Sequence, residues 1–148
     1  MMIILRYLLV STVILTVTMT KTAIAQTSNC SFSPPTPGSL VGSGGVLPTK
    51  LSSSDGGGTA STVSVTCNGS FSLSISSPNQ TSGHSFPPVS SIATVKTSTG
   101  LSTSSNQQNS PLSLSTGTTP LTINMSVDKG SPLTAGNYTF SVVLTIAP

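Results

Sequence analysis

Apolar and polar side chains alternate most regularly in the C-terminal part of this chain. From Tyr138 onward every second residue is apolar, and most of the residues between them are Thr or Ser. A repeat of two residues places successive side chains on opposite faces of a β-strand. We therefore expect a strand that begins near Gly136 and turns one face into a core. The side chains on that face are Tyr138, Phe140, Val142, Leu144 and Ile146.

Other segments show the same repeat and predict an all-β protein. The clear cases are residues 59–67, 71–75 and 121–127, and less regular patterns occur at 46–51, 90–97 and 111–115. No segment after residue 25 has the 3.6-residue period of an amphipathic helix. About seven short strands joined by Gly-, Pro- and Ser-rich turns are typical of an antiparallel β-sandwich.

The stretches between these strands predict turns and loops. Gly, Pro and polar residues dominate the segments 38–45, 76–89 and 100–110. The second of them contains three prolines and is also compatible with an edge of a sheet. Another proline cluster, Pro34, Pro35 and Pro37, follows the first cysteine.

The first 25 residues have the features of a secretory signal peptide. A mostly apolar stretch follows Arg6, and Ala23-Ile24-Ala25 forms a small-residue cleavage pattern. A retained membrane anchor is the alternative, but the apolar run is shorter than the roughly 20 residues that cross a bilayer. We therefore expect residues 1–25 to be removed and residues 26–148 to form one domain. That domain would be secreted to the periplasm or the cell surface, without a membrane anchor.

The predicted mature chain carries almost no charge. The whole chain has a formal net charge of +3, and removal of Arg6 and Lys21 leaves three lysines against two aspartates, or +1. Nucleic-acid-binding domains present a basic stripe and usually aromatic platforms. Because this chain has neither, we expect no nucleic-acid partner.

Cys30 and Cys67 are the two cysteines of the chain. In an exported protein two cysteines most simply form one disulfide, and closing a loop of this size contributes roughly 4 kcal/mol in the chain-entropy model. A metal-binding pair and a redox pair are the alternatives. Since the chain lacks C-x-x-C and has a single histidine, we expect neither a metal nor another cofactor.

The residue types of a catalytic triad are present, but their contexts are not catalytic. His84 lies in TSGHSFPP without a nearby G-x-S-x-G, and Asp55 and Asp128 lie beside glycines, where Asp favours turns. We expect no enzymatic activity and no small-molecule substrate. Glycan binding stays open, although the chain has no Trp and its mature part has one Tyr.

Both ends of the mature chain resemble a known family. The signal peptide, the early Cys30, the segment STVSVTC that ends at Cys67, and the ending AGNYTFSVVLTI are similar to subunits of chaperone–usher pili. They particularly resemble the spore coat U-type proteins of bacterial surfaces. Gly136, Asn137 and Tyr138 match the Gly-x-Tyr opening of the last strand in these families. Residues 76–119 carry no part of the resemblance.

The resemblance implies an immunoglobulin-like sandwich that lacks its final strand, with Cys30 paired to Cys67. A periplasmic chaperone, and after passage through an usher a neighbouring subunit, would fill the resulting groove with a donated strand. In this mode main-chain hydrogen bonds give affinity and alternate apolar side chains enter pockets. The apolar face of the C-terminal strand would then face the groove or the core beneath it.

Two features depart from the pilus pattern. If cleavage follows Ala25, four residues precede Cys30, too few to donate a strand. Ala147 and Pro148 replace the aromatic residue that pilus subunits commonly carry near the C-terminus. Our first hypothesis is a structural subunit or accessory component of a bacterial surface appendage or coat. The second is a self-complete exported module that binds a glycan or a protein.

Overall fold

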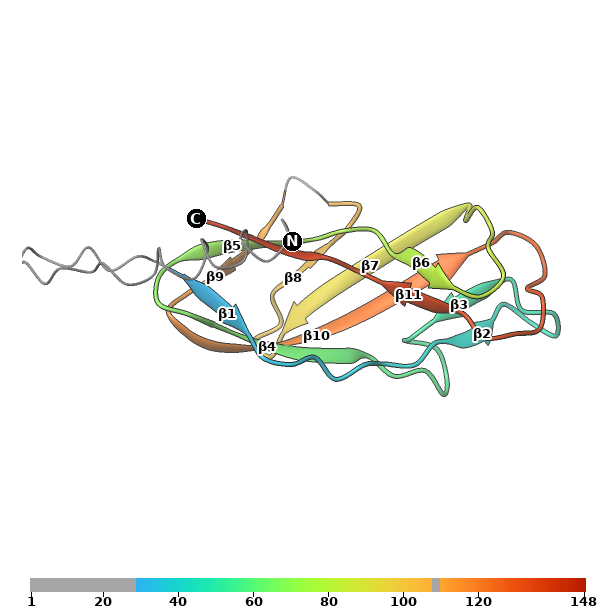
Figure 1. Cartoon of the computed structure of the whole chain (residues 1–148), viewed down its shortest axis with the longest axis horizontal. Coiled ribbons are helices and arrows are strands. Elements are labelled where there is room, and N and C mark those ends of the chain that lie inside the picture. The colour runs from blue at the N-terminus through green and yellow to red at the C-terminus, as the bar shows by residue number, and fades with distance from the viewer. Residues whose placement is uncertain (1–28, 108–109) are drawn as a thin grey trace, which may run out of the picture.

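The computed structural model describes residues 29–107 and 110–148. The predicted signal peptide, residues 1–25, lies outside the described residues. Within the described ranges the chain consists of strands and loops, and no helix there could span a membrane. The molecule is elongated, and most strands run along its length (Figure 1).

Seven strands form the larger sheet. They are β1 (Cys30–Phe32), β2 (Val41–Ser43), β3 (Lys50–Ser52), β4 (Ser61–Cys67), β7 (Ser90–Thr97), β8 (Ser102–Ser104) and β10 (Gly117–Asp128). β10 is central: β7 pairs with one side of it, and β8 continues the sheet beyond β7. On its other side β10 pairs with β4 and then with β3, while β1 and β2 lie outside those two strands. All these pairings are antiparallel.

Five further strands form two small antiparallel sheets. They are β5 (Phe71–Ile75), β6 (Asn79–Ser82), β9 (Leu112–Leu114), β11 (Thr139–Ser141) and β12 (Leu144–Ala147). β9 and β12 flank β5, and β11 pairs with β6. Because β6 continues from β5 and β12 continues from β11, the two small sheets form one second layer (Figure 1).

The hydrophobic core lies between the two layers. Its buried side chains come from β4, β7 and β10 of the larger sheet and from β5 and β9 of the second layer. Val65, Leu73, Ala93 and Val95 are completely buried. These β-branched and aliphatic side chains suit a pleated surface with one buried face. The arrangement confirms the predicted all-β, sandwich-like class.

The strands differ from the prediction in number and position. The described residues contain twelve strands, where about seven were expected. The predicted loops 38–45, 76–89 and 100–110 contain β2, β6 and β8, which have three or four residues each. A strand that short repeats its pattern too few times to be recognised in a polar sequence.

Several predicted strands have different bounds; β10, for example, spans Gly117–Asp128 where 121–127 was expected. Of residues 46–51 only the last two belong to β3, and Val46 is fully exposed in the preceding loop. Gly44 and Gly45 turn the chain there with φ of +103° and +111°. The C-terminal strand begins at Thr139, not near Gly136, and residues 142–143 divide it into β11 and β12.

Candidate functional site

A groove runs between the C-terminal strands and the segment that follows β1. Its volume is about 920 Å³. Residues 138–144 form one wall, which we call the C-terminal wall, and most of residues 32–40 form the other, which we call the proline wall. The floor includes Val63 of β4 and Ile123 and Met125 of β10. We call this cavity the terminal groove.

The C-terminal wall is paired on one side only. β11 pairs with β6 and β12 pairs with β5, and no strand among the described residues pairs with their other side. In the gap between them, Ser76 donates its N–H to the Val143 carbonyl, and Val143 donates its N–H to the Ser76 hydroxyl, both at 2.9 Å. Val143 opposite Ser76 continues the register in which β12 pairs with β5, and main-chain groups alternate in direction along such a chain, so we expect those of Val142 and Leu144 to point toward the terminal groove. Such an edge is a template for a further strand.

The apolar face of this wall is incompletely covered. Tyr138, Phe140, Val142, Leu144 and Ile146 are all only partly buried, whereas the inward side chains Val65 of β4 and Leu73 of β5 are fully buried. The first four of these five residues line the terminal groove. Ile146 lies beyond it and packs against the core, as Val142 and Leu144 also do.

The proline wall is held to the larger sheet at every third residue. The N–H groups of Ser33, Thr36 and Ser39 donate to the carbonyl oxygens of Ser64, Thr62 and Thr59 at 2.8 to 2.9 Å. This spacing is that of a polyproline helix, in which the chain repeats every three residues. A side chain at Gly38 would collide with the Thr59 carbonyl, so the wall lies directly against the chain that leads into β4.

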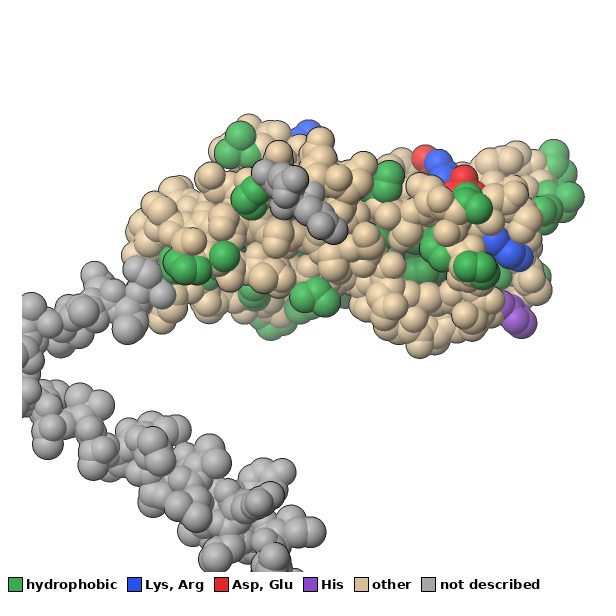
Figure 2. Space-filling model, turned by 90° about the horizontal axis from the view of Figure 1, so that it is seen from above, with side chains coloured by type: hydrophobic (Ala, Val, Ile, Leu, Met, Phe, Trp, Pro, Cys, Tyr) green, Lys and Arg blue, Asp and Glu red, His purple; other side chains and the backbone are tan. Residues whose placement is uncertain are grey.

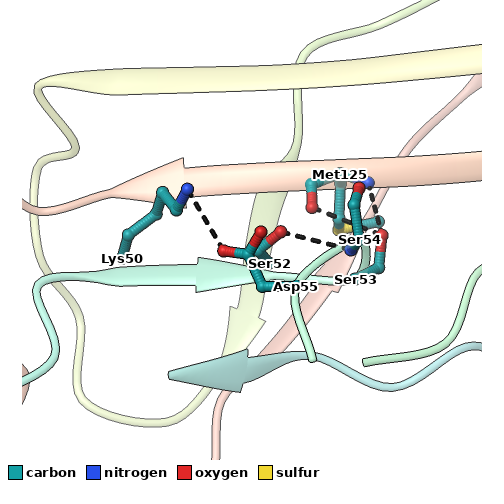
Figure 3. Close-up of polar contacts among 6 residues, drawn as sticks. All are labelled: Lys50, Ser52, Ser53, Ser54, Asp55 and Met125. Carbon is teal, nitrogen blue, oxygen red and sulfur yellow. Dashed lines mark hydrogen bonds and ion pairs between the residues drawn. The ribbon is translucent and has the colours of Figure 1, made fainter. Parts of the chain in front are cut away.

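Ser53 completes the sheet beneath the groove, where β10 changes its partner. β10 pairs with β4 as far as Ile123 and with β3 from Ser126, so Met125 faces neither strand. The buried Ser53 takes their place: its N–H donates to the Met125 carbonyl at 3.0 Å, and its hydroxyl accepts the Met125 N–H at 2.9 Å (Figure 3). Ser53 thereby satisfies both the main-chain N–H and the main-chain carbonyl of Met125 in the groove floor.

The terminal groove is electrically neutral. None of the described residues that line it is charged, and Figure 2 shows few charged side chains on a mostly uncharged polar surface. One ion pair lies near the floor, between Lys50 Nζ and Asp55 Oδ2 at 3.2 Å (Figure 3). The Ser43 hydroxyl and then Lys50 hold the pKa of the Asp55 carboxyl below its ordinary value.

The predicted disulfide between Cys30 and Cys67 is present. It joins facing positions of β1 and β4. Beside it, Asn29 donates its N–H to Asn68 Oδ1 at 2.6 Å, and the Asn68 N–H donates to the Asn29 carbonyl at 3.1 Å. Because the proline wall continues from β1, these bonds tie the segment that leads into the wall to the end of β4.

Gly136, Asn137 and Tyr138 lie in the loop before β11. The Tyr138 hydroxyl donates to the Thr134 carbonyl at 2.6 Å, and its ring meets the edge of Phe86 with ring centroids 5.9 Å apart. Phe86 also contacts Phe140, so an aromatic cluster closes this end of the C-terminal wall.

The residues considered for catalysis each make separate, structural contacts. His84 is exposed in the loop after β6, with its ring centroid 6.4 Å from that of Tyr138. Asp55 pairs with Lys50, and Asp128 Oδ1 accepts the Gly130 N–H at 2.8 Å in a turn. In the described part of the chain, no three His, Cys, Asp or Glu side chains gather where they could hold a metal ion.

Sequence reasoning missed the proline wall and most of the floor. The prolines at positions 34, 35 and 37 were visible, but nothing in their spacing says which strand they face. Met125 belongs to a predicted strand, yet its place in the floor depends on Ser53, which is distant in sequence.

Comparison with known proteins gives no relative: no family model, no curated protein and no solved structure matches this chain. The terminal groove and the unpaired edge beside it are therefore the features from which we infer a function.

Proposed function

We propose that this chain is a non-enzymatic structural subunit or accessory component of a bacterial surface appendage or coat. It would be exported, oxidised at Cys30 and Cys67, and assembled when an extended segment of another polypeptide enters the terminal groove. A periplasmic chaperone and usher, and then neighbouring subunits, would supply such segments. This role is the one implied by the resemblance of both chain ends to pilus subunits and spore coat U-type proteins.

The unpaired edge of β11 and β12 carries the proposal. Main-chain groups of Val142 and Leu144 point toward the groove, and a strand added there would satisfy them while covering the apolar face. The added strand would complete an immunoglobulin-like arrangement whose last strand comes from another chain.

Burial supplies the driving force in this proposal. Moving one Val, Leu or Phe side chain fully from water contributes about 1.5–3 kcal/mol. Tyr138, Phe140, Val142 and Leu144 are already partly buried, so completing their burial contributes a part of this amount at each position. Together with main-chain hydrogen bonds, the sum reaches several kcal/mol, which acts against the entropy cost of association.

The oligomeric state of the disulfide-bonded chain tests the proposal. When the chain is purified without a chaperone, we expect assemblies in light scattering or SDS-resistant ladders on gels, and their loss when an assembly chaperone is co-expressed. Val142→Asp places a charge in the groove and should weaken the assembly. Val89→Asp, at a position that is 72% exposed and outside the groove lining, is the matched control. A stable monomer that also forms no complex with a co-expressed assembly chaperone would contradict the proposal.

A self-complete binding module is the second candidate, and the size of the groove favours it. Pockets for small ligands commonly enclose about 300–1,000 Å³, and the terminal groove, at about 920 Å³, carries Tyr138 and Phe140 in one wall. A monomeric chain that binds a glycan or a folded protein, with loss of binding in Val142→Asp, would support this function instead.

A further inference from the structure

We infer that the segment entering the terminal groove is an uncharged, extended peptide of about seven residues that forms its main-chain ladder with the C-terminal wall alone. The inference rests on the proposed function and specifies the chemistry of the partner. It follows from an asymmetry between the two walls of the groove.

The dimensions and charge of the groove define the occupant. The C-terminal wall extends from Tyr138 to Leu144. A strand rises about 3.3 Å per residue, so about seven residues of an occupant lie beside this wall. No charged residue among those described lines the groove, and a charged side chain placed in it would lose hydration without gaining a partner. The side chains directed at Val63, Ile123 and Met125 should therefore be apolar.

The C-terminal wall presents main-chain hydrogen-bonding groups to an occupant at every second residue. Val143 uses its N–H and carbonyl on Ser76, away from the groove. Its neighbours Val142 and Leu144 direct theirs into the groove, with the two-residue period that a strand requires.

The proline wall offers no ladder. Pro34, Pro35 and Pro37 have no N–H, and the N–H groups of Ser33, Thr36 and Ser39 are bound to the β4 side. Between Ser33 and Ser39, therefore, at most the Gly38 N–H is available to an occupant. The carbonyl oxygens of this wall remain as acceptors, but their period of three cannot match the period of two in an extended occupant, so they cannot accept a continuous set of its N–H groups. The prolines would pack against the occupant without fixing its register.

This asymmetry has a measurable consequence for the occupant. Alternate N–H groups of an extended peptide point to opposite sides. One alternate set would donate to the C-terminal wall, and the other set would face the prolines. Replacing an amide by an ester removes the N–H without adding bulk, so it probes each set separately.

The probe is a capped peptide, Thr-Val-Thr-Val-Thr-Val-Thr, titrated into the disulfide-bonded chain by calorimetry. One variant carries esters at its three Val positions and the other carries esters at three Thr positions. We expect one variant to bind about tenfold or more weakly, because three hydrogen bonds are lost. The other should bind within about threefold of the parent peptide. The sensitive set also reports direction: the inward Val set for an antiparallel occupant, the Thr set for a parallel one.

Two controls assign the binding to the terminal groove. A peptide with Lys in place of Val should not bind, and Val142→Asp should abolish binding of the parent peptide while Val89→Asp retains it. Thermal unfolding of both variants checks that they are folded. Binding unchanged by Val142→Asp in a folded chain would overturn the inference.

The remaining outcomes separate this inference from the proposed function. Equal losses for the two ester variants would show that both walls form ladders and would overturn the one-sided pairing, with the proposed function intact. A chain that assembles only above the concentration of the titration, and does not bind the parent peptide below it, would overturn the stated chemistry of the occupant. A chain that neither assembles nor binds the peptide would overturn the proposed function as well.

Discussion

Ser53 shows how one side chain can support the floor of the terminal groove. It satisfies the N–H of Met125 at the point where β10 has left β4 and not yet met β3. We expect Ser53→Ala to reduce the free energy of unfolding by about 1–3 kcal/mol, because a main-chain donor in the sheet loses its partner. Urea unfolding followed by circular dichroism measures the effect.

The adjacent Ser54 provides the control for this prediction. Its side chain is exposed, and Figure 3 shows only its main-chain N–H bound, to the Ser52 hydroxyl. Ser54→Ala should change the free energy of unfolding by less than about 0.5 kcal/mol. Equal effects of the two substitutions would contradict the role given to Ser53.

Asp55 links the stability of the β3 region to pH. Its pKa is lowered in the folded chain, by the Ser43 hydroxyl first and Lys50 second, so below its ordinary value the unfolded chain binds more protons. The stabilisation is complete above the ordinary carboxyl value of about 3.9 and is lost as the pH falls through the lower folded value. We expect the urea midpoint to drop from pH 6 to pH 3 by more in the wild type than in Asp55→Asn.

The size of this pH effect should be modest, because the ion pair is about one-third exposed and solvent screens it. Added salt should reduce the wild-type drop in midpoint without changing that of Asp55→Asn. The same drop in both chains would show that Asp55 does not contribute to acid sensitivity.

At the scale of the element, the strands of the second layer differ in how completely they are covered. Leu73 of β5 is fully buried, and truncation of such a residue to Ala costs about 2–5 kcal/mol. Leu144 of β12 is partly exposed to the terminal groove. We therefore expect Leu144→Ala to cost less than half as much as Leu73→Ala in urea unfolding of the free chain.

Thr145, which faces outward between two inward residues of β12, is the control for this comparison. Thr145→Ala should be nearly neutral. If Leu144→Ala cost as much as Leu73→Ala, the C-terminal wall would already be covered and would need no occupant.

At the scale of the whole molecule, an open edge is combined with very little charge. Among residues 29–148 three lysines, Lys50, Lys96 and Lys129, stand against two aspartates, Asp55 and Asp128, and a domain near zero net charge resists association poorly. The disulfide stabilises the closed part of the sandwich by tying β1 to β4. A sandwich that is tied together at β1 and β4 and has an unpaired edge at β11 and β12 is suited to pairing with a second chain. The assembly experiment tests this pairing directly.

Several features of the fold could be predicted from local patterns. The segments around Val63, Leu73 and Ile123 became β4, β5 and β10 because each repeats its alternation several times. The polar β2, β6 and β8 could not be recognised, since their pairing partners and not their side chains make them strands. The C-terminal segment was predicted as one strand, and its division at residues 142–143 depends on Ser76, far away in the sequence.

The order of residues was enough to predict the all-β class and the inward face of the C-terminal strands. It also made a disulfide the simplest state for the cysteine pair. These properties are local or compositional: a period of two selects a face, and an exported chain with two cysteines has one pairing to form. The terminal groove required the folded chain, because its walls come from opposite ends of the sequence and its floor from the middle. Which edge stays unpaired depends on the partners that every other strand has found, and a long-range pairing of this kind leaves no periodic mark in the residues themselves.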